Sequence, residues 1–257
     1  MSSRNISSLR LIATLPIVYV TATFYLPIVL MAFEGLRGEG LDSYRRVLLN
    51  PNYLSIIGYS GAIALIVTLA TLLLATPAAY FLAFYVTSEA GKNKLLVAFT
   101  VPMLVNFLLK AYALMNIFSV FGLANSFTAI VLGMIYEYLP LMLLPVYSTF
   151  ERVERRLLEA AETLGAKPLQ TVFRVLLPVS LPGILSGVTL VFLMSFTEFV
   201  APAMLGGVYG YTVGFLIWDL FLKYRNWQAG SILALVITAV SILAVYAYMR
   251  WGAELEA

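Results

Sequence analysis

The sequence of 257 residues contains neither cysteine nor histidine. Without cysteine there is no disulfide and no thiolate nucleophile, and without histidine the commonest general base of enzymes is missing. The usual zinc and haem ligand sets draw on these two residue types and are excluded as well. We therefore expect no catalytic residue, no metal site and no cofactor bound by this chain.

Charged residues are also scarce, at 11% of the chain, whereas 61% of the residues are hydrophobic. A soluble domain carries roughly 25% charged residues, which help to cover its surface with polar groups. This chain cannot cover itself in that way, so we expect a lipid bilayer around it. The net charge of +3 is small and does not indicate nucleic-acid binding.

Long apolar runs make up most of the sequence. A helix of about 20 apolar residues crosses the roughly 30 Å of hydrocarbon in a bilayer. Six runs of this kind are found, at about residues 11–33, 56–86, 95–120, 126–148, 181–205 and 230–249. The first is longer than the apolar core of a signal peptide and lacks an obvious small-residue cleavage site, so we expect a span there. The expected fold is all-α, a single transmembrane domain over residues 1–257 with six transmembrane helices.

Lysine and arginine set the expected orientation, because short cytoplasmic loops of membrane proteins are enriched in them. With the N-terminus in the cytoplasm, ten of the 16 Lys and Arg residues fall on the cytoplasmic side of the six spans. We therefore expect a multi-pass protein with both termini cytoplasmic.

Residues 151–178, between the fourth and fifth runs, are the most charged part of the chain. Leu157, Ala161 and Leu164 recur at helical spacing, which predicts a short amphipathic helix outside the membrane. Gly165 stands where a left-handed residue would end this helix, and Pro168 can begin a second helix. The pattern alone also fits a solvated hairpin or a helix lying on the lipid surface.

The same segment carries a motif with fixed gaps. Glu159-Ala160-Ala161 is followed after three residues by Gly165, and after nine more by Val175 and then Leu177-Pro178. It resembles the EAA loop in permease subunits of binding-protein-dependent ATP-binding cassette (ABC) importers. In that family the loop forms coupling helices that insert into a groove on the cytoplasmic ATPase subunit. The resemblance implies this coupling role for six residues: Glu159, Ala160, Ala161, Gly165, Leu177 and Pro178.

Further stretches resemble the spermidine/putrescine branch of this family. They are Gly40-Leu41-Asp42-Ser43-Tyr44, Gly122-Leu123-Ala124-Asn125, Tyr138-Leu139-Pro140 and Glu198-Phe199-Val200-Ala201-Pro202 followed by Leu205-Gly206-Gly207. The resemblance implies a type I importer permease in the cytoplasmic (inner) membrane that moves a small solute, such as a polyamine or another organic cation. It also implies three kinds of partner: ABC ATPase subunits, a second permease subunit that is identical or homologous, and an extracytoplasmic solute-binding protein.

ATP would be used by the partner subunit. The sequence has no Gly-rich phosphate-binding segment that ends in Gly-Lys-Ser or Gly-Lys-Thr. The alternative of another class is a self-contained channel or an ion-coupled carrier, which would need no ATPase. The motif in residues 151–178 favours the importer.

Two acidic residues fall inside apolar runs, where ionisable groups usually face a bundle interior or a water-filled cavity. Glu137 would lie near the middle of the fourth span and Glu198 in the outer half of the fifth. Facing a pathway, they would attract a cation, and Tyr138 or Phe199 could stack against it. Alternatively, each carboxylate fixes helix packing, for example by pairing with Lys110. Lys110 could also contact the pathway, or extend to water at the outer end of the third span.

Overall fold

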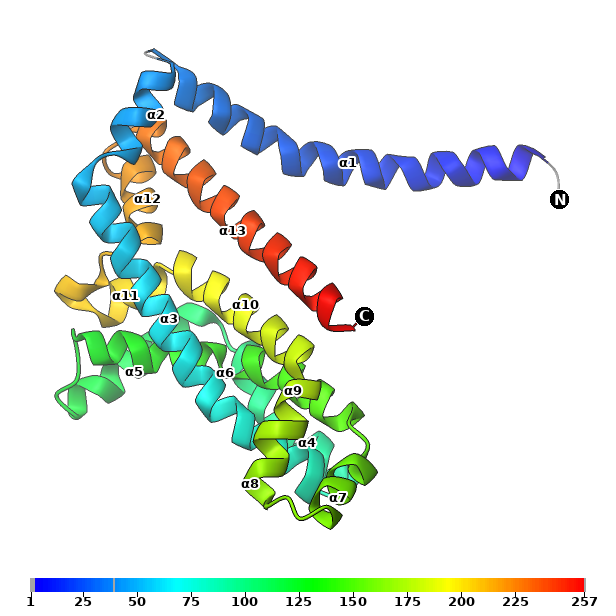
Figure 1. The fold of residues 1–257 in the computed structure, drawn as a ribbon. Coiled ribbons are helices and arrows are strands. Elements are labelled where there is room, and N and C mark those ends of the chain that lie inside the picture. The colour runs from blue at the N-terminus through cyan, green and yellow to red at the C-terminus, as the bar shows by residue number, and fades with distance from the viewer. Residues whose placement is uncertain (1–2, 39, 257) are drawn as a thin grey trace. The chain divides into compact units, whose positions relative to one another are not determined.

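The structure is a computed structural model that describes residues 3–38 and 40–256. Throughout this part of the chain the regular elements are helices (Figure 1). The chain divides into two compact units, which are described separately. Unit 1 comprises residues 1–53 and 217–239, and unit 2 comprises residues 54–216 and 240–257.

Unit 1 contains the long helix α1 (Ser3–Leu36), the short helix α2 (Leu41–Leu48) and the junction between α12 (Val213–Leu222) and α13 (Trp227–Glu256). Gln228, in the first turn of α13, holds these parts together. Its side-chain amide donates to Ser43 Oγ at 2.9 Å and to the backbone carbonyl of Arg37. Hydrogen bonds from a neutral side chain therefore fix the loop after α1.

Unit 2 is built around α6 (Phe127–Arg152), which packs against α10 (Leu181–Thr197). Small residues let the two helices approach closely. A Cβ atom added at Gly187 of α10 would lie only 2.9 Å from Met142 Sδ of α6. Around this pair lie α3 (Pro51–Tyr80), η1 (Phe81–Tyr85), α4 (Glu89–Leu104), α5 (Phe107–Val120), α7 (Arg155–Thr163), α8 (Pro168–Thr171), η2 (Val172–Leu176), α9 (Leu177–Val179), α11 (Val200–Leu205) and η3 (Gly207–Gly210).

The six expected spans correspond to four long apolar helices and two bent helix pairs in the described residues. The run at 95–120 was expected as one helix, and this expectation is wrong. The chain bends by 95° between α4 and α5. Asn106 causes the break, because its side chain accepts hydrogen bonds from the N–H groups of Leu108 and Leu109 and so caps a new helix.

The expected boundaries of the fifth span and of the loop after it also need correction. Helix α10 ends at Thr197, and α11 begins at Val200, so the run at 181–205 is interrupted near its end. Residues 206–229 lie between the fifth and sixth expected spans, yet they contain the apolar helix α12. The break near 198 depends on single polar residues, and the ten residues of α12 are too few to be read as a span from the sequence.

The loops of unit 2 gather at two ends. Helices α7 and α8 lie together at one end, and α5 lies beside α11 at the other (Figure 1). At the α7 end, Lys92 Nζ lies 2.7 Å from Glu151 Oε1. At the α11 end, the hydroxyl of Tyr59 donates to the backbone carbonyl of Tyr209 at 2.8 Å. The segments at 84–92 and 150–178 thus share one end, as the expected topology requires.

Candidate functional site

The EAA-like loop forms two helical segments joined at Gly165. Helix α7 ends at Thr163, and Gly165 adopts a φ of +92°. The N–H of Gly165 donates to Glu162 O at 2.9 Å, and the N–H of Ala166 donates to Ala161 O at 3.1 Å. These two bonds form a Schellman C-cap, in which glycine is favoured because it has no Cβ. The expectation that Gly165 ends the first helix is confirmed.

The second helical segment starts where the sequence predicts. Pro168 is the first residue of α8, and the N–H of Lys167 donates to Gln170 Oε1 at 3.0 Å. The segment continues through η2 and α9, which contains Leu177 and Pro178, and then bends by 74° into α10. The loop is therefore continuous with a membrane-crossing helix.

The motif residues divide by exposure. Glu159, Ala160, Gly165 and Pro178 are exposed, whereas Ala161 and Leu177 are half-buried. On the apolar side of α7, Leu157 and Leu164 are 44% and 89% exposed. Two further apolar side chains of the loop that the sequence analysis did not identify, Leu169 and Phe173, are 72% and 66% exposed.

A buried ion pair lies on α5 and α6. Lys110 Nζ lies 2.7 Å from Glu137 Oε1 and 2.6 Å from Oε2. Only 6% of the lysine side chain and 19% of the glutamate side chain are exposed. The expectation that Lys110 extends to water is therefore wrong, and its alternative, pairing with Glu137, is confirmed. The pair compensates two charges that would be costly to bury separately.

Glu198 occupies the break between α10 and α11. Its Oε1 accepts hydrogen bonds from the N–H groups of Phe199 (2.9 Å), Val200 (2.7 Å) and Ala201 (3.4 Å). Its Oε2 accepts one from the hydroxyl of Tyr138 at 2.5 Å. The carboxylate therefore caps α11 and ties it to α6.

Adjacent residues of α6 link the two carboxylates. Glu137 pairs with Lys110, and the next residue, Tyr138, donates to Glu198. Tyr138 is only 3% exposed, whereas Phe199 is half-buried. The structure thus places the five expected pathway residues in two contacts that start at neighbouring positions of α6, and together we call them the polar network. One contact joins Lys110 to Glu137, and the other joins Tyr138 to Glu198, whose carboxylate also accepts from the N–H of Phe199.

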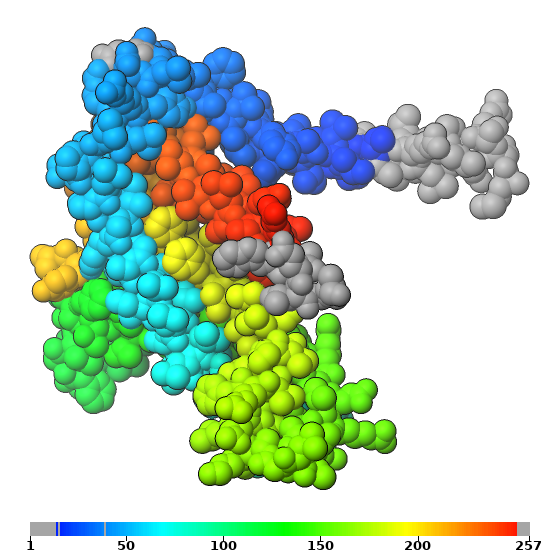
Figure 2. Space-filling model, in the orientation of Figure 1, coloured from blue at the N-terminus to red at the C-terminus, as the bar shows by residue number. Residues whose placement is uncertain are grey.

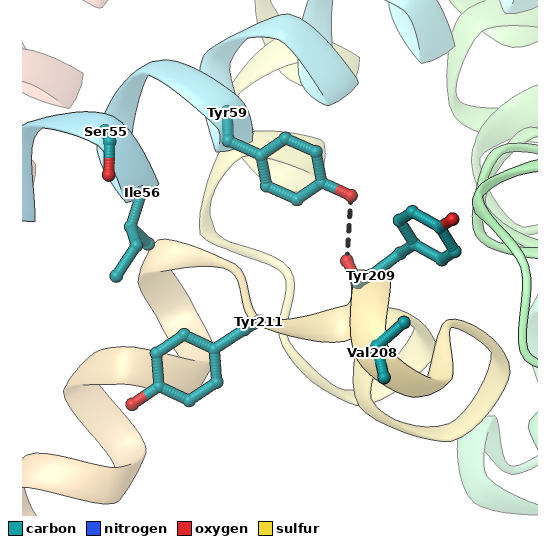
Figure 3. A pocket seen from close by; sticks show the side chains of 6 residues that line it. All are labelled: Ser55, Ile56, Tyr59, Val208, Tyr209 and Tyr211. Carbon is teal, nitrogen blue, oxygen red and sulfur yellow. Dashed lines mark hydrogen bonds between the residues drawn. The ribbon is translucent and has the colours of Figure 1, made fainter. Parts of the chain in front are cut away.

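A tyrosine-lined pocket of about 360 Å³ opens at the α11 end of unit 2 (Figure 3). It is lined by Ser55, Ile56, Tyr59, Val208, Tyr209 and Tyr211. The hydroxyl of Tyr59 points from α3 toward η3 and holds the backbone there (Figure 3). The sequence analysis missed this site, because its two halves are about 150 residues apart.

An apolar groove of about 870 Å³ lies between α3 and the segments α8 to α10. The two surfaces lie side by side in Figure 2, α3 in cyan and α8 to α10 in yellow-green. Leu69, Leu73, Phe173, Leu177 and Leu181 are among its lining residues. Leu169 and Phe173 of the EAA-like loop also line this groove.

Residues 75–253 match the model of the family described as "Binding-protein-dependent transport system inner membrane component". The chain belongs to this family. It is therefore a permease subunit of an ATP-driven importer, as the EAA-like motif implied. Its location in the inner membrane agrees with the apolar helices of the structure.

Several individual members of the family are similar to this chain. The permease is 35% identical over 227 residues to the spermidine/putrescine permease PotB of Escherichia coli K12, and the match covers 82% of both chains. It is 33% identical to PotB of Haemophilus influenzae, over 79% of this chain and 76% of the other. It is 24% identical, over 93% of this chain, to PhnU of Salmonella typhimurium LT2, a putative 2-aminoethylphosphonate permease.

Solved structures confirm the type I importer permease fold. A bacterial importer of the polysaccharide alginate superposes with a TM-score of 0.76 over 97% of this chain and 96% of the other, at 14% identity. The MetNI methionine importer superposes with a TM-score of 0.63 over 79% of this chain and 95% of the other, at 16% identity.

One buried ionisable residue of the permease is not among the residues expected from the sequence. Asp219, in α12, is 2% exposed, and its carboxylate lies 3.7 Å from Lys223 Nζ. Asp219 interrupts the apolar stretch 213–222, which lies outside the six expected spans. Across the described ranges, no three acidic residues are grouped closely enough to hold a metal ion.

Proposed function

We propose that this permease is one of two permease subunits in an importer of a polyamine or another small organic cation. A solute-binding protein would deliver the cation from outside, and two ABC ATPase subunits would use ATP in the cytoplasm. The similarity to PotB, across about four fifths of both chains, supports the substrate class. Residues 1–257 would act as one transmembrane domain, with residues 151–178 as its coupling loop.

The exposed apolar surface of the coupling loop is the observation that supports binding of an ATPase subunit there. Leu164, Leu169 and Phe173 are each at least 66% exposed, next to the exposed turn at Gly165. Apolar side chains gathered on a surface mark protein interfaces. The surface therefore suits the groove of an ATPase subunit, with Glu159, Ala160 and Pro178 around it.

Binding of the ATPase to the coupling loop would determine the orientation of the permease in the membrane. The α7 end must face the cytoplasm, and the tyrosine-lined pocket would then face outward. Lys92, Arg152, Arg155, Lys167 and Arg174 are all at or near the α7 end, as the positive-inside rule favours. Both termini are cytoplasmic in this arrangement.

The polar network supplies the negative charge of the cation pathway. Lys110 pairs with Glu137, whereas the carboxylate of Glu198 lies next to the half-buried ring of Phe199. Within the hydrocarbon region this charge would stabilise an ammonium group that has lost part of its hydration. The ring could add a cation–π contact.

Uptake by the assembled transporter in vesicles tests the proposal. We expect spermidine or putrescine to accumulate only with ATP and the binding protein, and 2-aminoethylphosphonate, the matched control amine, not to accumulate. Uptake of 2-aminoethylphosphonate instead of polyamines would overturn the substrate class. Uptake without ATP would favour a self-contained channel or an ion-coupled carrier.

A further inference from the structure

Two polar contacts join the coupling loop to the end of α3 and the start of α4. The guanidinium of Arg155, the first residue of α7, donates from Nη2 to the backbone carbonyl of Phe84 at 2.9 Å. One turn earlier, Glu151 at the end of α6 accepts from Lys92 at 2.7 Å. The base of the loop is therefore attached to a segment about 70 residues away in the sequence.

The carbonyl of Phe84 is well suited to this contact. Phe84 lies in η1, the π-helical turn that ends α3. The last carbonyls of a helix have no partner within the helix and carry the negative end of its dipole. A guanidinium satisfies such a carbonyl with a charge-assisted hydrogen bond, which is stronger than a neutral one.

The other end of α3 holds the loop at the α11 end. Tyr59 donates to the carbonyl of Tyr209, and Ser60 Oγ accepts from the N–H of Val213 at 2.7 Å. Next to Val213, the hydroxyl of Thr212 donates to the backbone carbonyl of Glu198 at 2.9 Å. One helix therefore contacts the coupling loop at one end and the surroundings of Glu198 at the other.

Helix α3 can transmit a displacement between these ends. Helical structure continues from Pro51 through Pro77 to Tyr85, and its inward face is buried. From Tyr59 to Phe84 it spans about 38 Å at 1.5 Å per residue. Shifts of helices by about 1–2 Å are a recurrent part of conformational switching in proteins.

We infer that Arg155 is a positioning residue that transmits motion of the coupling loop to the Glu198 region through α3. The ion pair between Lys92 and Glu151 holds the start of α4 against the end of α6, close to Arg155. The inference rests on the proposed docking of an ATPase on this loop. It assigns Arg155 to the transmission of the motion and not to the docking itself.

The test compares Arg155→Ala with Arg155→Lys in the assembled transporter. Uptake and ATP hydrolysis are both measured per intact complex. We expect Arg155→Ala to retain the ATPase subunits and their hydrolysis but to lower solute moved per ATP about tenfold, as for loss of one charged hydrogen bond. Arg155→Lys keeps one donor and should recover part of the ratio. Lys92→Ala should lower the ratio less, and exposed Lys94→Ala should leave it unchanged.

Two outcomes would overturn the inference. An unchanged ratio in Arg155→Ala would show that the contact with Phe84 transmits nothing. Loss of the ATPase from Arg155→Ala, with Arg155→Lys also unable to retain it, would place Arg155 in the docking surface instead. If the ATPase docks elsewhere, variants of Gly165 will remain fully coupled, whether or not Arg155→Ala lowers the ratio. Failure of the proposed docking can therefore be distinguished from failure of the inference about Arg155.

The far end of α3 gives a second measurement. Tyr59→Phe combined with Ser60→Ala removes both contacts there without touching the coupling loop. We expect the same loss of solute moved per ATP, with normal assembly and hydrolysis. A double variant that transports at the unmodified ratio would contradict transmission through α3.

Discussion

Lys110 and Glu137 form a bidentate ion pair between α5 and α6, with Nζ lying 2.7 Å and 2.6 Å from the two carboxylate oxygens. Each charge is buried against apolar helices and compensates the other. Removal of either partner would leave an uncompensated charge in a medium of low dielectric constant, which costs about 3–5 kcal/mol. The pair therefore ties α5 to α6.

The first prediction follows from this geometry. Lys110→Met should destabilise the subunit by about 3–5 kcal/mol, whereas Lys110→Met combined with Glu137→Met should be much closer to the unmodified protein. Thermal unfolding of the detergent-solubilised complex measures both. A double variant as unstable as the sum of the two single variants would contradict the ion pair.

The second prediction concerns the charge of Glu198. Glu198→Gln keeps an oxygen for the three N–H groups of α11 but removes the charge. If a cation passes this carboxylate, uptake should fall about tenfold, because a nearby unit charge contributes more than about 1 kcal/mol at an effective dielectric constant near 20. Uptake is measured per intact complex.

Tyr138→Phe is the matched control for Glu198→Gln. It removes the hydroxyl that donates to Oε2 but leaves the charge of Glu198 in place. We expect lower stability and a smaller loss of uptake than in Glu198→Gln, because the aromatic ring of residue 138 and the carboxylate of Glu198 both remain. Equal uptake in both variants and in the unmodified protein would remove Glu198 from the pathway and leave it as a helix cap.

The sequence predicts the membrane-crossing helices because each is a long apolar run. It does not predict the breaks within them, although Asn106 and Glu198 carry a local signal, since both side chains accept hydrogen bonds from the next few N–H groups. A hydropathy profile averages these single polar residues away. Helix caps within apolar runs should therefore be searched for separately.

The turn at Gly165 was predictable because a Schellman cap depends on residues close in sequence. The pairing of Tyr138 with Glu198 was not, because the two residues lie 60 positions apart and meet only when α6 packs on α10. The same holds for Tyr59 and Tyr209. Local conformation follows from the sequence, whereas contacts between distant helices require the structure.

The third prediction concerns topology. The chain has no cysteine, so single cysteines can be introduced without a background. Cysteine at Ser88 or Lys167 should react only with a reagent on the cytoplasmic side, and cysteine at Val208, which is 88% exposed, only with a reagent outside. Labelling of Lys167→Cys from outside would invert the subunit and place the coupling loop beyond the reach of an ATPase.

The last prediction tests the coupling loop at its turn. Gly165 adopts a φ of +92°, where a Cβ atom is strained, and no described atom lies within 4 Å of a Cβ built there. Any effect of a side chain must therefore come from the backbone or from a docked partner. Gly165→Val should cost about 1–3 kcal/mol at this turn, because a β-branched residue strongly disfavours positive φ.

Gly165→Asn is the matched control, because asparagine adopts left-handed conformations far more readily than valine. We expect Gly165→Val to insert normally in the membrane but to lose most ATPase binding and ATP-driven uptake, and Gly165→Asn to retain a large part of both. Co-purification of the ATPase with each variant, followed by uptake per complex, decides the matter. Full coupling in Gly165→Val would show that the turn is not the docking element, and equal loss in both variants would point to the open space around Gly165 and not to its backbone.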